Sequence, residues 1–192
     1  MKASITNLLF LNALELASHA EKARASGMVQ TEIRSSIGTH LMAALALEGA
    51  VNEVAETVLG PWVWDRLEKV DTPLKWWIVL GLFSKESLDP GREPIQTIHQ
   101  LHKLRNRIAH PKLLEQGSDI ILRHSDGRIE RDVPAEKVLQ GGETLYMGYG
   151  ELLDELNAES ARRAIDRTKA ALCYLNDRAK YPGLDWLNAP GD

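Results

Sequence analysis

The side chains best suited to chemistry lie in one short stretch, residues 101–112, which reads LHKLRNRIAHPK. Within it, Arg105 offers a planar set of donors that suits a phosphate, Asn106 can orient a group, and His110 titrates near neutral pH and can carry a proton. The stretch contains no acidic residue, although the formal net charge of the whole chain is −4. The pattern therefore predicts a local basic site in an otherwise acidic chain.

The same stretch is predicted to be the end of a helix, because Pro111 disfavours helical geometry in the residue before it. On a helical wheel of about 100° per residue, Arg105 falls within an arc of apolar side chains. Glu48 and Asn52 interrupt the apolar stripe of an earlier helix in the same way. A charge on an apolar face is costly unless it is paired. We therefore expect Glu48 to form a desolvated ion pair with Arg105.

The element Arg-Asn-x-x-x-His at the end of this helix, residues 105–110, resembles the signature of HEPN domains. That family consists of α-helical bundles that are often dimeric, and many of its members are ribonucleases that need no metal ion. The resemblance implies four catalytic roles: acid or base for His110, phosphate ligand for Arg105, positioning group for Asn106, and orientation of Arg105 by Glu48. The expected substrate-binding residues belong to the same basic segment and are His102, Lys103, Arg107 and Lys112.

A single chain makes an awkward site, because Arg105 and His110 diverge by about 140° on an ideal helix. In families of this kind, two such helices face each other across a two-fold axis. We therefore expect a homodimer that cleaves RNA by attack of the 2′-hydroxyl on the adjacent phosphorus, without a metal ion or a cofactor. The resemblance also suggests a toxin or phage-defence role, with a cognate antitoxin or another protein as partner. The competing interpretation is a non-catalytic HEPN-like module that binds a nucleotide, RNA or a protein partner. In that case Glu48 and Arg105 only join two helices, and Asn106 and His110 cap the end of the helix.

Hydrophobic periodicity predicts an all-α fold, an antiparallel bundle of about five helices that forms one domain over residues 1–192. The HEPN-like core is matched best over 31–112, and a C-terminal helix at 151–178 completes it. Between them, a small β-hairpin is predicted at 119–132, turning at Asp126-Gly127. The other predicted helices span residues 3–26, 31–59, 61–69, 73–84 and the segment that Pro111 ends.

Apolar residues indicate which faces of these helices are buried. Helix 73–84 is apolar nearly all round, which predicts a central position or cover by a second subunit. His99 and His102 share a helix face, but no carboxylate or cysteine completes a metal-ligand set, so a surface or interface pair is expected. Four tryptophans are expected in core or dimer contacts, Trp62, Trp64, Trp76 and Trp77. The predicted inward stripe of helix 31–59 is Ile37, Leu41, Ala44, Leu45, Ala55, Val58 and Leu59.

Composition limits the class of protein. A hydrophobic content of 44% and a charged content of 26% are typical of a globular domain, and the net charge of −4 argues against a protein that coats nucleic acid generally. The only cysteine, Cys173, cannot form an internal disulfide and is expected to be a small core residue. The apolar run Leu8–Leu11 is too short for a signal peptide, and no segment reaches the roughly 18 apolar residues of a membrane span. The cytoplasm, with no membrane partner, is the expected compartment.

Overall fold

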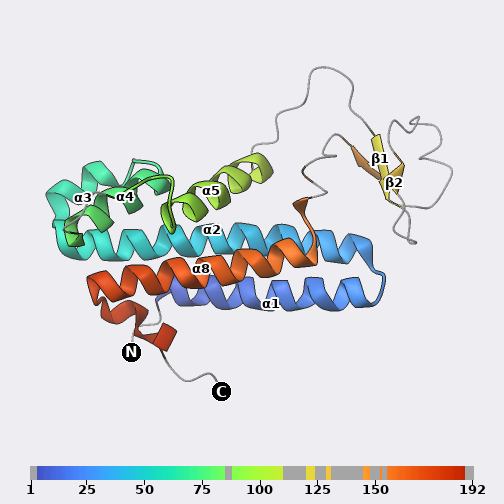
Figure 1. Ribbon diagram of the computed structural model, residues 1–192, viewed down its shortest axis with the longest axis horizontal. Helices are drawn as coiled ribbons and strands as arrows, with labels where there is room; N and C mark the ends of the chain where they lie inside the picture. Colours follow the sequence, from blue (N-terminus) through green and yellow to red (C-terminus); the bar gives the residue numbers. More distant parts are fainter. Residues whose placement is uncertain are drawn as a thin grey trace.

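The computed structural model describes residues 4–84, 88–109, 120–123, 129–130, 145–147, 152 and 155–188, and it is mostly helical (Figure 1). The predicted helical character is therefore confirmed. Each predicted helix has an observed counterpart, but the C-terminal helix begins at Ala158 instead of residue 151. The helices are α1 (Ile5–Ala25), α2 (Val29–Leu59), α3 (Pro61–Leu67), α4 (Thr72–Phe83), α5 (Ile95–Ala109) and α8 (Ala158–Ala179), followed by a 3-10 helix, η1 (Pro182–Asn188).

Among the described residues between α5 and α8, three short strands are present. β1 (Ile120–Arg123) pairs antiparallel with β2 (Ile129–Glu130) on one edge and with β3 (Leu145–Met147) on the other. β1 and β2 fall within the range for which a hairpin is predicted, and its expected turn at Asp126-Gly127 lies outside the described residues. β3 has no counterpart among the predicted elements.

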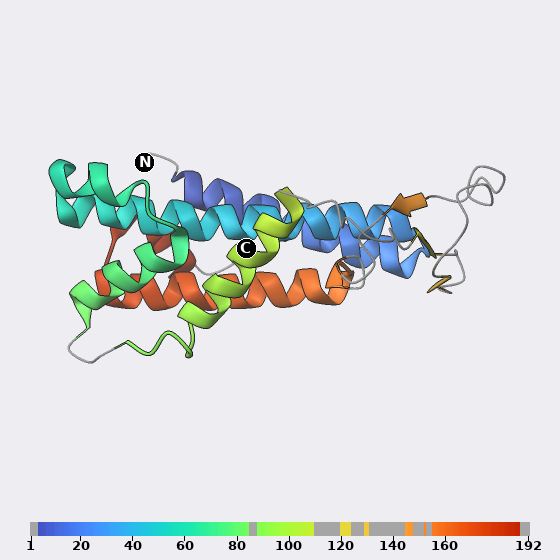
Figure 2. The ribbon, with the colours of Figure 1, turned by 90° about the horizontal axis from the view of Figure 1, so that it is seen from above.

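The long helix α2 is the centre of the molecule. It packs against α1 and α8 on one side and contacts α3, α4 and α5 on the other (Figures 1 and 2). Gly27, with φ +70°, forms the tight turn that reverses the chain between α1 and α2. The facing sides of α1 and α2 are rich in alanine, which lets two helices approach closely. These buried alanines are Ala13, Ala17 and Ala20 of α1 and Ala43, Ala46 and Ala50 of α2.

The buried face of α2 differs from the predicted stripe. Ile37, Leu41 and Leu45 are only half-buried, and Val58 is exposed. Because helices cover α2 from several directions, its buried surface is wide and includes polar side chains such as Thr39 and His40. The apolar residues that fill it are Ile33, Ala43, Ala44, Ala46, Leu47, Ala50, Val51, Val54 and Ala55.

Helix α4 is buried on one side only. Trp76 is fully buried, whereas Leu74, Trp77 and Leu82 are about half exposed and lie at helical spacing on the opposite side. Of the four tryptophans expected in core or dimer contacts, Trp76 is in the core, whereas Trp77 and Trp62 of α3 are exposed on the single chain. The predicted core position of Cys173 is wrong, since its side chain is half-buried.

Among the helices of the described residues, none combines the length and the apolar character required to cross a membrane.

Candidate functional site

The predicted site lies on the second half of α5. The first half of this helix is anchored by the buried residues Ile95, Thr97, Ile98 and Leu101. From His102 to Ala109, every side chain is half-buried or exposed. Figure 2 shows α5 crossing α2 obliquely, and Figure 1 shows the end of α5 farther from α2 than its start. The predicted catalytic His110 and the predicted substrate-binding Lys112 lie outside the described residues.

Arg105 is held by its own neighbour. Its Nη1 donates a hydrogen bond of 2.9 Å to Oδ1 of Asn106, so Asn106 orients the guanidinium. The predicted ion pair with Glu48 is wrong, because no ion pair joins these two side chains in the part of the chain that the structure describes. Arg105 is half-buried instead of sealed in the core. It therefore keeps donors for a ligand.

The polar residues of α2 that prompted the pairing have other neighbours. Asn52 accepts a hydrogen bond of 3.0 Å from Nζ of Lys75, a lysine that is only 2% exposed. The Lys75 ammonium also lies 5.5 Å from the ring centre of Trp64, at cation–π distance. The negative charge of Glu48 raises the pKa of His102 on α5. The structure thus brings Glu48 to the predicted face of α5 without bonding it to Arg105.

The surroundings of His102, in the second half of α5, change the pKa of its side chain. Burial lowers the pKa of its imidazole below the usual 6.5, and the positive charge of Arg105 lowers it further. Asp71 and Glu48 raise the pKa in opposition, and His99 lowers it slightly. His102 is therefore neutral at pH 7, so that a ring nitrogen can accept a proton or a hydrogen bond.

Lys103 and Arg107 point to a different face of α5, where they line an open pocket of about 510 Å³ between α2, α5 and α8. Arg163 and Arg167 of α8 line the opposite wall. The predicted substrate-binding residues are thus divided between two faces, with His102 beside Arg105 and the other two described cations in the pocket. Sequence reasoning did not single out the α8 arginines, although their spacing of four residues places them on one helix face.

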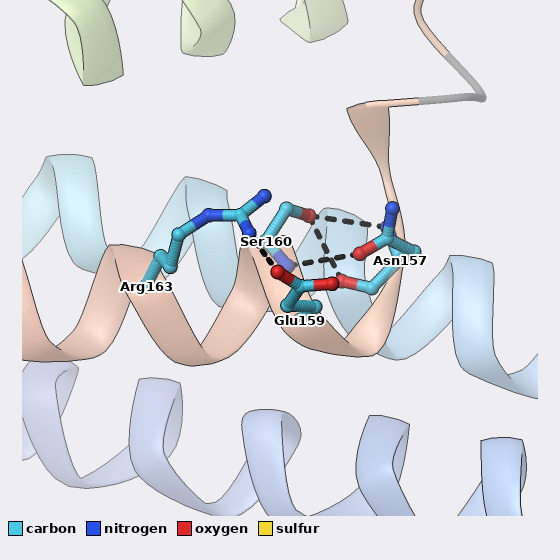
Figure 3. A network of polar contacts seen from close by, with 4 residues as sticks. All are labelled: Asn157, Glu159, Ser160 and Arg163. Carbon is cyan, nitrogen blue, oxygen red and sulfur yellow. Dashed lines mark hydrogen bonds and ion pairs between the residues drawn. The ribbon is translucent and has the colours of Figure 1, made fainter.

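The start of α8 is fixed so that its arginines face this pocket. Asn157 Oδ1 accepts a hydrogen bond of 2.9 Å from the backbone N–H of Ser160, and the Ser160 hydroxyl bonds back to the Asn157 backbone (Figure 3). This reciprocal capping satisfies N–H groups that the first turn leaves free. From α2, buried Glu32 accepts a hydrogen bond of 2.9 Å from the Ala158 N–H. Figure 3 also shows Arg163 paired with Glu159 one turn away.

His40 of α2 forms part of the pocket floor and was also missed from the sequence. It is 3% exposed, and its Nδ1 donates a hydrogen bond of 2.8 Å to the Ser36 carbonyl. A carbonyl can only accept, so this bond assigns the hydrogen to Nδ1 and leaves Nε2 as an acceptor while the ring is neutral. Burial lowers the pKa of His40, Arg163 adds to this, and the Ser36 bond and Glu155 oppose it.

The stability of the protein should therefore depend on pH. The folded-state pKa of His40 lies below the unfolded value of 6.5. At a pH between these two pKa values, the unfolded chain therefore binds more protons than the folded protein. The free energy of unfolding is then highest above about pH 6.5 and falls as the pH drops toward the folded pKa. Urea unfolding from pH 7.5 to 5.5 should give a smaller decrease for His40→Gln than for wild type. An unchanged decrease in His40→Gln would contradict the assignment.

Among the residues that the structure describes, no three His, Cys, Asp or Glu side chains are grouped so that they could hold a metal ion. Comparison of the chain with protein-family models, with curated proteins and with solved structures gave no match.

Proposed function

We propose that this protein is a metal-independent endoribonuclease of the HEPN type that acts as a homodimer, with its helices in an antiparallel HEPN-like bundle. The observation that carries the proposal is the state of Arg105. Its guanidinium is half-buried, is oriented by Asn106 and has no carboxylate partner among the described residues. A structural arginine that only joins two helices would be closed off by an acid. A guanidinium held ready by a neutral amide suits an incoming phosphate.

The proposed reaction needs a base, an acid and positive charge at phosphorus. A base removes the proton of the 2′-hydroxyl, whose oxygen then attacks the adjacent phosphorus. The bond to the 5′-oxygen breaks, and an acid returns a proton to that leaving oxygen. The products are a 2′,3′-cyclic phosphate and a free 5′-hydroxyl. In the dimer, the two His110 side chains are the base and the acid, and Arg105 stabilises the charge on the pentavalent phosphorus.

Two neighbouring features support this assignment. His102 lies one helical turn from Arg105 and is neutral at pH 7, so it can accept a hydrogen bond from a ribose hydroxyl. Lys103 and Arg107 lie on a different face of α5, and their positive charge would attract RNA to this helix without contacting the phosphate beside Arg105. On the resemblance alone, we further propose a cytoplasmic toxin or phage-defence role with a cognate antitoxin.

Dimerisation should use the exposed apolar side of α4. This surface contains no charged side chain and consists of Leu74, Trp77, Ile78, Gly81 and Leu82. Helix α4 packs directly on α5, so a partner that covers α4 would also bring a second α5 near the first. Leu82→Glu should weaken self-association about 30-fold or more, measured by sedimentation velocity. Leu11→Glu on α1 is the matched control, because Leu82 is 54% exposed and Leu11 is 52% exposed. Equal effects of both substitutions would exclude α4 as the interface.

RNA cleavage tests the proposed function directly. Purified protein should cut a mixed RNA pool in the presence of excess chelator and leave cyclic-phosphate ends. His110→Ala should lower the rate by about 100-fold or more because proton transfer is lost. His19→Ala, on the exposed side of α1, should retain the wild-type rate. The proposal fails if a folded wild-type dimer cuts no RNA, or if cleavage survives the loss of His110.

A non-catalytic module remains the second candidate, and the pocket between α2, α5 and α8 favours it. A concave, positively charged site that does not contain Arg105 is suited to holding a ligand without any reaction. Specific binding without cleavage would support this candidate.

A further inference from the structure

The pocket between α2, α5 and α8 gathers positive charge from two helices. Lys103 and Arg107 of α5 face Arg163 and Arg167 of α8 across it, and the carboxylate among its lining residues is Glu155. Cations that converge on a concave surface repel one another and raise the local concentration of anions. The lining therefore has an excess of positive charge that a bound anion would neutralise.

The present partners of these cations leave them available. Arg107 Nη1 donates to both Glu155 oxygens, at 3.1 and 2.9 Å, and Arg163 pairs with Glu159, but all four side chains are substantially exposed. Exposed ion pairs of this kind contribute little and open readily. Arg167 Nη1 donates to a neutral acceptor, Oε1 of Gln100, at 3.0 Å. A phosphate can replace each of these partners with a stronger, charge-assisted contact.

The floor of the pocket provides an independent observation. Thr97 is 2% exposed and lines the pocket, and its Oγ1 has no hydrogen-bond partner within the part of the chain that the structure describes. Buried hydroxyl groups without a partner are rare, because losing water without compensation is costly. His40 lines the same pocket, and its Nε2 is the ring nitrogen left to accept a hydrogen bond when the ring is neutral. An unsatisfied donor and an acceptor beneath a ring of cations indicate a site for a ligand.

We propose that this pocket binds a small molecule that carries two or more phosphate groups. Its volume of about 510 Å³ lies within the range typical of small-molecule sites. The phosphates would bridge the α5 and α8 cations, and Thr97 and His40 would bond to the ligand from below. Leu101, Leu104 and Ala164 offer an apolar wall for an organic portion. The site is separate from the proposed cleavage site, because Arg105 and Asn106 are not among its lining residues.

Calorimetric titration of the full chain with tripolyphosphate tests the proposal. Arg163→Gln and Arg167→Gln should each weaken binding about tenfold, the value of one charged hydrogen bond. Arg162→Gln is the matched control, because this neighbouring arginine pairs with Glu21 and Asp166 outside the pocket. Thr97→Val should also weaken binding while the thermal transition of the unliganded protein does not fall, which excludes misfolding as the cause. A parallel titration with ATP separates the sources of phosphate: tighter binding than tripolyphosphate indicates an organic ligand, and equal binding indicates an inorganic one.

Three results would overturn the proposal. The first is no binding of tripolyphosphate at low salt. The second is equal weakening by Arg162→Gln and Arg163→Gln, which would mean diffuse attraction to the surface of α8. The third is binding of an RNA oligonucleotide that requires Arg163 and Arg167 while tripolyphosphate does not bind, which would make the pocket an RNA-binding groove. Because every readout is binding, the outcome is independent of whether the protein cleaves RNA.

Discussion

Replacing Arg105 by lysine should lower the rate of RNA cleavage by about 10²- to 10³-fold, although the positive charge is retained. The expected loss comes from geometry. The guanidinium is planar and can donate to two phosphate oxygens while Nη1 remains bonded to Asn106 Oδ1 at 2.9 Å. A lysine ammonium is a point charge on a flexible stem and cannot hold both contacts in one plane. The measurement is the single-turnover rate on a defined RNA, with enzyme in excess.

Two further variants test the charge of Arg105 and the orientation of its guanidinium separately. Arg105→Ala should lose at least as much activity as Arg105→Lys. Asn106→Ala removes the acceptor that orients the guanidinium, and it should cost about tenfold, the value of one hydrogen bond to a charged group. Arg92→Lys is the matched control, because Arg92 precedes α5 and its side chain is 83% exposed. Full activity in Arg105→Lys would show that charge alone suffices, and the role assigned to the guanidinium plane would then be wrong.

The helices could be predicted from the sequence because their signals are local. Apolar periodicity, Gly27 and Pro61 are read within a few residues of the helix ends that they mark. Which face of a helix is buried depends on how many neighbours it has, and this information is not local. Apolar spacing predicts one inward stripe on α2, but several helices cover α2, so its buried face includes His40 and the Ala43–Leu47 segment except Leu45.

The difference between local sequence signals and tertiary packing also explains which parts of the site could be predicted. The basic segment of α5 was recognised from residue types alone, and Arg105 and Asn106 are indeed in contact. The expected ion pair of Arg105 with Glu48 is wrong because a helical wheel shows which way a side chain points but not how deeply it is buried. At Arg105 the helix has already moved away from the core, so the apolar arc no longer means burial. Arg163 lies 56 positions after Arg107 in the sequence. Only tertiary packing places these two arginines opposite each other.

Trp76 should be the side chain of α4 whose loss costs most stability. It is 0% exposed, and its Nε1 donates a hydrogen bond of 3.0 Å to the Leu47 carbonyl of α2. Trp76→Ala removes this contact and leaves a cavity between α4 and α2, so the free energy of unfolding should fall by about 3–5 kcal/mol. Trp76→Phe keeps most of the buried area and should lose about 1–3 kcal/mol, from the smaller ring and the missing hydrogen bond.

The neighbouring Trp77 is the control that the chain itself provides. It is 42% exposed, and its Nε1 reaches the Leu88 carbonyl at the long distance of 3.4 Å. Trp77→Ala should therefore lower the stability of the monomer by only about 1 kcal/mol or less. Urea unfolding of both variants should be measured in a Leu82→Glu background, so that loss of dimerisation does not enter the comparison. In the background that can dimerise, Trp77→Ala should instead reduce self-association. Similar losses of monomer stability for the two tryptophans would mean that the surface assigned to Trp77 is part of the core, and the proposed α4 interface would have to be abandoned with it.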